Sequence, residues 1–283
     1  MASLPGNRQL VDSRGRALFT LRDINSLDEH EKERIYRVIV PDSLFERFRI
    51  SGETFLGADG ERAVRFITPA GLGVVRIHVR RNSCDPDDAF FLEIADTHYH
   101  QMELSLCVIN DPSSPRFDVD VDEHGRDNCF STMGRNIPEE VRSMEAGLYP
   151  NQTHRGMRMF GEFLAGFERF VDALGMEFII AEPLSYDNAI RYEKYGFDYI
   201  SGKKMMLDIN EGFRTGNLYA RRLDGSTPFR KPGSETTVHG RSWAIHDGIL
   251  GVPWDGIKIY FKVGQRAGVD TFPERVKEPA RTA

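Results

Sequence analysis

One segment constrains the fold more than any other: residues 156–174 predict a long amphipathic helix that is followed at once by a short apolar strand. The apolar side chains of this helix recur every three or four residues and are Phe160, Phe163, Leu164, Phe167, Phe170, Val171 and Leu174. Gly175 stands where a helix commonly ends. Residues 176–181 (MEFIIA) are nearly all apolar, which predicts a strand that is buried on both faces of a sheet.

The same alternation of helix and strand continues downstream, and it follows a strand-rich half of the chain. A helix closed by Gly196 is predicted at residues 186–195, with a strand at 197–209. Upstream, the patterns predict a strand at 17–24, helices at 26–40 and 44–49, and strands at 62–68, 73–80, 89–110 and 117–122. The run 89–110 is too long for one strand, so a turn is expected near residues 96–98. The fold class expected is α/β, with a mixed, largely antiparallel central sheet flanked by helices.

The composition changes along the chain and suggests three parts. Residues 1–16 are polar and predict a loose leader, and residues 17–209 form one continuous α/β domain in this interpretation. Residues 210–283 are rich in glycine and proline, and only residues 257–263 (IKIYFKV) clearly predict a strand. We therefore expect an irregular C-terminal extension that folds back on the main domain.

Charge and composition exclude several classes of protein. The formal net charge of −6 argues against a nucleic-acid partner, because binding phosphates needs clustered lysine and arginine. No stretch approaches the roughly 20 apolar residues of a membrane span, and the first residues do not resemble a signal peptide. Three cysteines without CxxC spacing are typical of a reduced protein. We expect a cytoplasmic protein with a small-molecule substrate; a homodimer stays open.

A loop containing Arg155 and Gly156 leads directly into the predicted helix at 156–174. The first turn of a helix has free backbone N–H groups and a positive dipole end. Such a junction is suited to a phosphate or pyrophosphate group.

The segment 147–200 resembles the GNAT acyltransferase superfamily. Those proteins have an Arg/Gln-x-x-Gly-x-Gly/Ala loop before a helix, and later a helix that ends in Tyr-Glu-Lys-x-Gly-Phe. Residues 192–197 (YEKYGF) fit that ending. In the loop, Gly156 matches, whereas Thr153 replaces the usual Arg/Gln and Arg158 stands where a second Gly or Ala is usual.

This resemblance implies an enzyme that uses acetyl-CoA or another acyl-CoA as co-substrate and acylates a small-molecule amine. It implies a general-acid role for Tyr192, which would protonate the departing CoA thiolate. It also implies that the cofactor-binding residues are Arg155, Gly156, Met157, Arg158 and Asn188. Arg155 and Arg158 could supply charge-assisted hydrogen bonds to phosphate in place of the altered loop.

A second constellation is formed by Asp96, His98 and His100. On a strand these three side chains would share one face, with neighbours about 6.6 Å apart. Two of them could then bind one divalent metal, with a third ligand from elsewhere, and the candidates are His124, Glu145 and Glu182. In an acyltransferase, His98 or His100 could instead face the acceptor and deprotonate its amine.

Three hypotheses for function follow. The leading one is an acyl-CoA-dependent acyltransferase with Tyr192, His98 and His100 as catalytic residues. The second is the same fold used as a metal-dependent enzyme of oxidative or lyase type, with the metal at Asp96, His98 and His100. The third is a non-catalytic ligand sensor.

Overall fold

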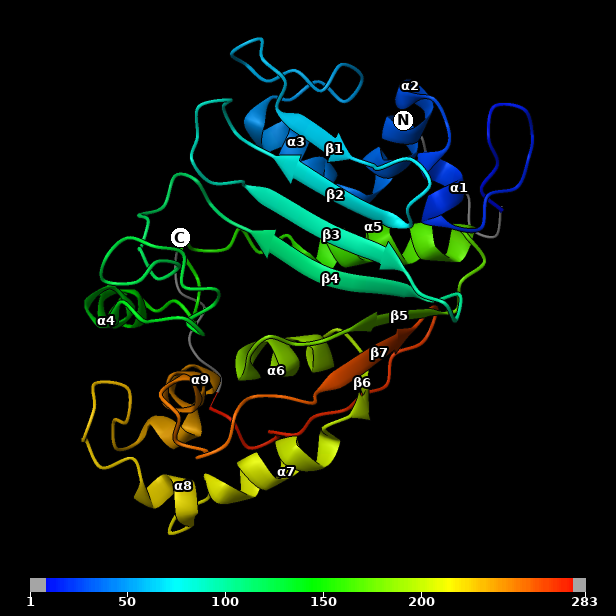
Figure 1. Ribbon diagram of the computed structural model, residues 1–283. Helices are drawn as coiled ribbons and strands as arrows, with labels where there is room; N and C mark the ends of the chain where they lie inside the picture. Colours follow the sequence, from blue (N-terminus) through cyan, green and yellow to red (C-terminus); the bar gives the residue numbers. More distant parts are fainter. Residues whose placement is uncertain (1–8, 277–283) are drawn as a thin grey trace. The chain divides into compact units, whose positions relative to one another are not determined.

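The computed structural model describes residues 9–276, and they divide into two compact units (Figure 1). Unit 1 takes in the chain up to Ser114, together with residues 156–181 and 260–265. Unit 2 takes in residues 115–155, 182–259 and the chain from Arg266 onward. Neither unit has a boundary at residue 17 or 209, where the sequence predicts the ends of the main domain. The first eight residues of the predicted leader lie outside the described residues.

Seven strands form one mixed sheet in the order β1-β2-β3-β4-β5-β7-β6. The strands are β1 (Val64–Ile67), β2 (Val74–Val79), β3 (Phe90–Asp96), β4 (Met102–Ile109), β5 (Phe178–Ala181), β6 (Asp198–Ser201) and β7 (Lys258–Lys262). Strands β1 to β4 form an antiparallel meander, whereas β4 and β5 are parallel. The predicted fold class, a mixed and largely antiparallel α/β sheet with flanking helices, is confirmed.

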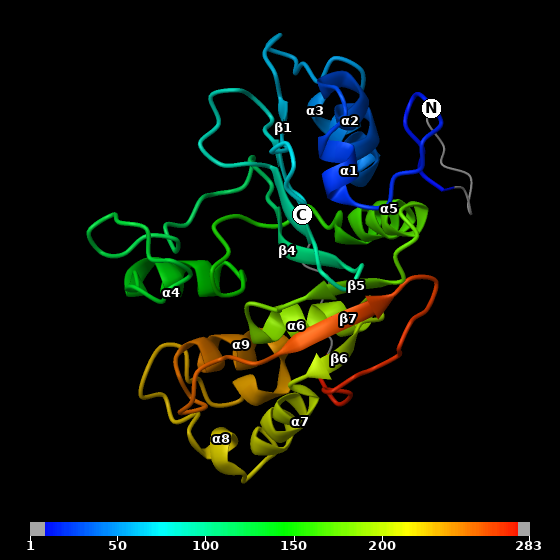
Figure 2. The ribbon, with the colours of Figure 1, turned by 45° about the vertical axis from the view of Figure 1, so that its right-hand side comes forward.

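In unit 1, helices cover one face of the meander (Figure 2). They are α1 (Leu21–Asn25), α2 (Glu29–Tyr36), the 3-10 turn η1 (Arg37–Ile39), α3 (Asp42–Phe48) and α5 (Phe160–Ala173). Burial alternates along β2, where Val75 and Ile77 are fully buried and Arg76 is exposed. This period of two shows that the helix-covered face is the core face of the sheet.

Helix α5 is the predicted amphipathic helix. Phe163 and Phe167 are fully buried and their rings stack 5.5 Å apart. Gly166 allows close packing, since a Cβ there would lie 2.9 Å from the carbonyl oxygen of Val38. Gly175 follows the helix with φ +73°, the left-handed conformation that favours glycine. The predicted helix is therefore confirmed, although it begins four residues later than expected.

Unit 2 is mainly helical. Its helices are α4 (Ile137–Glu145), α6 (Tyr186–Lys194), α7 (Lys203–Gly212), α8 (Leu218–Arg221), the 3-10 turn η2 (Ser234–Thr236) and α9 (Val238–His246). Its aromatic centre is Trp243 of α9, which stacks on Phe229 at 5.2 Å and packs with Met144 of α4. Helix α6 contacts α9. Helices α8 and α9 lie in the region that the sequence predicts to be irregular.

Three local predictions are wrong. Residues 17–24 hold the start of α1 in place of a strand, because Thr20 and Asp23 form a capping box that begins a helix. Residues 117–122 form no strand; the Asp122 carboxylate accepts backbone hydrogen bonds from His124 and Arg126 and closes a turn. The predicted strand at 197–209 stops after β6, because Gly202 has φ +88° and α7 follows it.

Candidate functional site

Strand β4 continues past the point at which β5 leaves it, as Figure 1 shows. The two strands pair only from Met102 to Leu104, opposite Ile179 to Ala181. The register between β3 and β4 shifts at this point, so that Ser105 forms a bulge. Bulges redirect a strand and are frequent next to active sites. β4 thus provides five residues, 105–109, that lie beyond its pairing with β5.

The side chains of this extension are only partly covered. Met102 and Leu104 are buried, whereas every residue from Ser105 to Ile109 is half-buried, although Leu106, Val108 and Ile109 are apolar. Half-buried apolar side chains on a strand segment that β5 does not pair with are a suitable surface for a ligand that is partly apolar.

The predicted phosphate loop lies against the far end of β4. A Cβ placed on Gly156 would lie 3.3 Å from the carbonyl oxygen of Ile109, closer than an ordinary contact. Gly156 is therefore a position where the loop backbone packs closely against the end of β4. Helix α5 begins four residues later, and its N-cap residue Met159 makes no side-chain capping hydrogen bond.

The other predicted cofactor-binding residues of the loop differ in exposure. Arg155 and Arg158 are exposed and Met157 is half-buried. Arg158 has φ +61°, a left-handed conformation that is uncommon for a residue with a Cβ. This position, Arg158, is thus held in a conformation that glycine adopts easily.

Tyr192 and Asn188 lie on α6 in unit 2, whereas Gly156, Met157 and Arg158 belong to unit 1. Tyr192 is half-buried and its ring contacts Phe197 with centroids 4.8 Å apart. The Asn188 side-chain amide donates to Ser185 Oγ over 2.7 Å. The predicted helix at 186–195 and its glycine end are confirmed, and the role of Tyr192 stays a prediction.

Two residues of the YEKYGF segment have structural roles. The buried carboxylate of Glu193 accepts hydrogen bonds from Tyr199 Oη at 2.5 Å and from Thr271 Oγ1 at 2.7 Å. Gly196 has φ +96°, and a Cβ there would lie 2.3 Å from Cδ of Arg266. The segment that carries the family resemblance is therefore also needed to hold the C-terminal residues of unit 2.

Asp96 lies on a strand as predicted, as the last residue of β3, but the strand placement of His98 and His100 is wrong. The predicted turn is present, but it takes in both histidines, which are exposed between β3 and β4, and His100 has φ +54°. Asp96 ends β3, and its carboxylate accepts hydrogen bonds from the backbone N–H groups of Leu21 and Arg22. It therefore caps α1, and the one-face geometry on which the metal hypothesis depended is absent.

No group of three or more His, Cys, Asp or Glu side chains that could hold a metal ion occurs within residues 9–276. The predicted third ligands His124, Glu145 and Glu182 are all exposed. Glu182 is paired with Lys258 at 2.7 Å.

Glu103 is a further functional candidate, which no sequence motif marks. It lies on β4, opposite Ile180 of β5 and two residues before the bulge at Ser105. Its side chain is half-buried, and Ser105 Oγ donates to Oε1 over 3.4 Å. Its carboxylate lies near the point where the pairing of β4 with β5 ends. The sequence alone does not show that pairing, and no sequence motif surrounds Glu103.

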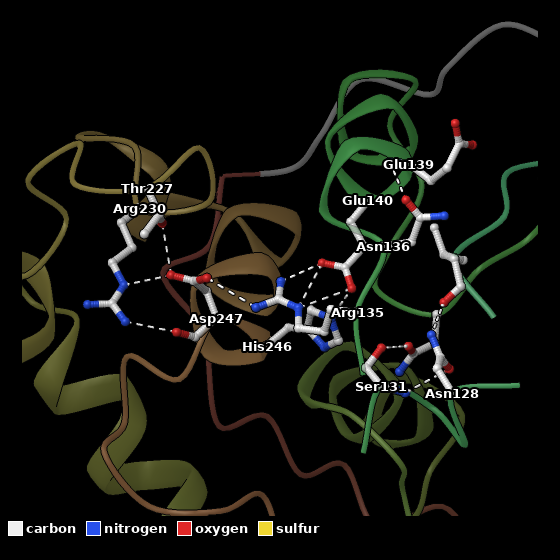
Figure 3. Close-up of polar contacts among 12 residues, drawn as sticks. Asn128, Ser131, Arg135, Asn136, Glu139, Glu140, Thr227, Arg230, His246 and Asp247 are labelled. Carbon is white, nitrogen blue, oxygen red and sulfur yellow. Dashed lines mark hydrogen bonds and ion pairs between the residues drawn. The ribbon is translucent and has the colours of Figure 1, made fainter. Parts of the chain in front are cut away.

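Unit 2 contains a buried charge network that joins α4 to the end of α9 (Figure 3). Glu140 is 1% exposed and accepts hydrogen bonds from both Nε and Nη2 of Arg135, while His246 Nε2 lies 3.2 Å from its Oε1. Arg135 also reaches Asp247 at 3.3 Å, and Asp247 accepts from Arg230 Nε at 2.8 Å. Every member of the network has a partner, which is typical of a structural role.

None of the described helices has the length and apolar character needed to cross a membrane. No protein-family model, curated protein or solved structure matches the chain.

Proposed function

We propose that the protein is a cytoplasmic, acyl-CoA-dependent acyltransferase that acts on a small-molecule amine. The observation that carries the proposal is the parting of β4 from β5 at the Ser105 bulge, with Gly156 packed against the other end of the same β4 segment. The resemblance of residues 192–197 to the GNAT ending supports the same function.

The shape of CoA suits this arrangement. Its pantetheine arm is extended and contains two amide groups, which can bind a strand edge as an added strand does. The half-buried apolar residues Leu106 and Val108 flank that edge. In the proposed complex the pyrophosphate lies at Gly156 and the first turn of α5, where backbone N–H groups favour an anion. The thioester end then points along β4 toward Leu104.

The proposed reaction forms one bond and breaks one. The amine nitrogen attacks the thioester carbonyl carbon and a C–N bond forms, after which the C–S bond breaks and CoA leaves as a thiol. A general base takes the proton that the amine loses, and a general acid gives a proton to the sulfur; the family resemblance implies Tyr192 for that acid. A phenol of ordinary pKa about 10 can protonate a thiolate whose conjugate acid has a pKa of about 8–9.

Glu103 is better placed than His98 and His100 to be the base. The two histidines precede the first residue of β4, whereas Gly156 packs against its last residue. Because the eight residues of β4 span about 23 Å, the length of the strand separates the histidines from Gly156. Glu103 lies where β4 and β5 part, which is where the thioester of an extended pantetheine arm would be.

We expect Glu103→Gln to slow acyl transfer roughly 100-fold at pH 7, because glutamine cannot accept the amine proton. The loss should shrink as the pH approaches the pKa of the acceptor amine. Steady-state rates with an amine that the wild type acylates test this. The comparison is the double variant His98→Ala, His100→Ala, for which we expect less than about a threefold change. A larger loss of rate in the histidine variant than in Glu103→Gln would show that His98 or His100 is the base.

We expect Gly156→Val to weaken CoA binding by at least about tenfold, or roughly 1.4 kcal/mol. The added side chain would push the loop away from Ile109, because its Cβ alone would lie 3.3 Å from the Ile109 carbonyl oxygen. Isothermal titration with CoA measures the effect. Gly52→Val, at an exposed position of unit 1 where an added Cβ would meet only the Arg37 side chain at 3.8 Å, is the matched control and should bind CoA as the wild type does.

The function itself is tested by titrating the protein with acetyl-CoA and then assaying free thiol release with a panel of small amines. Binding followed by amine-dependent thiol release is the expected result. Failure of millimolar CoA to bind would refute the proposal. Binding without turnover of any amine would favour the ligand-sensor hypothesis.

A further inference from the structure

The helices of unit 1 cover one face of the β1–β4 meander, and the opposite face carries charged side chains (Figure 2). Its basic residues lie on β1 and β2 and are Arg65, Arg76 and His78, whereas its carboxylates lie on β3 and β4 and are Glu93 and Glu103. The strand register sets Arg65 opposite His78 and Arg76 opposite Glu93, and opposite residues point to the same face. This face of unit 1 therefore has a cationic side and an anionic side.

Arg76 is oriented by Glu93 and keeps one edge of its guanidinium open. Its Nε donates a hydrogen bond to Oε2 of Glu93, directly opposite on β3. Within the part of the chain that the structure describes, Nη1 and Nη2 of Arg76 donate no hydrogen bond. These two nitrogens form the end-on edge of the guanidinium, which matches the paired oxygens of a carboxylate. The Arg76 side chain is 54% exposed, so a ligand can reach that edge.

Glu103 lies on the same face, two strands away from Arg76. It is opposite Ala95, which follows Glu93 by two residues on β3 and so points to the same side of the sheet. With neighbouring strands about 4.8 Å apart and alternate residues of a strand about 6.6 Å apart, the Cα atoms of Arg76 and Glu103 are about 12 Å apart. The small side chain of Ala95 leaves space beside Glu103.

That separation limits the size of a ligand that contacts both groups. A hydrogen bond of about 2.9 Å at each end takes up about half of the distance. The rest accommodates a small molecule whose amine and anionic group are a few bonds apart. Such a molecule also matches the charges of the face, because its anionic end lies on the cationic side.

We propose that Arg76 binds the carboxylate of the acceptor, which is therefore an amino acid or a related amino-carboxylate. This identification of the acceptor rests on the proposed function, in which Glu103 takes the proton from the amine. One arginine balances the single negative charge of a carboxylate, whereas a phosphate group carries a charge of about −1.5 to −2. Bound in this way, the carboxylate fixes one end of the acceptor, and its nitrogen lies beside Glu103.

The test compares amino acids with their carboxamides, which have the same amine but no carboxylate. Glycine, β-alanine and 4-aminobutyrate differ in the spacing of amine and carboxylate, and thiol release from acetyl-CoA gives kcat/KM for each acid and its amide. We expect the wild type to prefer the acid form of at least one of them by about 10-fold to 100-fold. We expect Arg76→Gln to reduce this preference to less than about threefold. A general loss of activity would not change this ratio.

Arg65→Gln is the matched control, because it removes a positive charge from the same face of the sheet. Arg65 is exposed and lies one strand further from Glu103 than Arg76 does, so this variant should keep the preference of the wild type. An equal loss of preference in both variants would overturn the assignment to Arg76. Faster acylation of 2-aminoethyl phosphate than of β-alanine by the wild type would overturn the choice of a carboxylate.

Two results separate this inference from the proposed function. If the wild type acylates acids and amides equally well, Arg76 does not select the acceptor, while the acyltransferase function stands. If no amine or amino acid releases thiol, NMR titrations with the three amino acids in the absence of acetyl-CoA decide the matter. Binding that Arg76→Gln weakens about tenfold or more would retain the carboxylate site without the function, and equal binding would overturn both.

Discussion

Replacing Glu140 by glutamine is expected to destabilise unit 2 by roughly 3–5 kcal/mol, the usual loss when one partner of a buried ion pair is removed. The change keeps the size of the side chain but leaves the Arg135 guanidinium without its bidentate partner. It also removes the charge that faces His246. Urea unfolding monitored by tryptophan fluorescence measures the loss, because Trp243 lies in the same aromatic centre.

The control for this variant is Glu145→Gln, on the same helix. Glu145 is exposed and Glu140 is 1% exposed, so the control should change the free energy of unfolding by less than about 0.5 kcal/mol. Equal effects of the two substitutions would show that the network in Figure 3 does not stabilise unit 2.

The loss should also depend on pH. Burial raises the pKa of Glu140, but hydrogen bonds from His246 and Arg135 outweigh that effect and hold the pKa below its ordinary value of 4.5. A carboxyl whose pKa is lowered by folding stabilises the folded state above its unfolded pKa and loses that contribution as the pH falls through the folded pKa. The difference between wild type and Glu140→Gln should therefore be constant above about pH 5.5 and shrink in more acidic solution.

The sequence predicts the fold best where a helix has a long apolar stripe and a glycine at the position where that stripe ends. Helix α5 combines a four-turn apolar stripe with Gly175, and α6 ends at Gly196. Prediction fails where a short pattern has two explanations. Residues 17–24 alternate as a strand does, yet the Thr20 capping box begins a helix there. Three aspartates between residues 118 and 122 fit an edge strand, yet Asp122 closes a turn.

The candidate site was less predictable than the fold, because its parts come together only through tertiary pairing. The loop proposed to bind phosphate could be selected from the sequence, since Gly156 lies at the start of a helix that the apolar pattern predicts. Residues 105–109 of β4 could not be selected, because their role depends on β5 pairing with Met102–Leu104 and no further. His98 and His100 were predicted to share one face of a strand, whereas they lie in a turn of five residues that separates β3 from β4.

Tyr192→Phe is expected to lower kcat about 10²-fold to 10⁴-fold if Tyr192 protonates the leaving thiolate, since that is the usual contribution of a general acid. The substitution removes only the hydroxyl, so the ring contact with Phe197 at 4.8 Å can persist. The free energy of unfolding should change by less than about 1 kcal/mol. Steady-state kinetics at saturating acetyl-CoA, together with urea unfolding, measure both effects.

A matched comparison separates catalysis from packing. Tyr195 is half-buried one turn further along, at the end of α6, and Tyr195→Phe removes a hydroxyl that the proposed reaction does not use. Donor thioesters with more acidic thiols leave without a proton, so the rate loss in Tyr192→Phe should become smaller as the thiol pKa falls. A loss that is the same for every thiol would mean that Tyr192 positions the substrate. A loss equal to that of Tyr195→Phe would assign it a packing role.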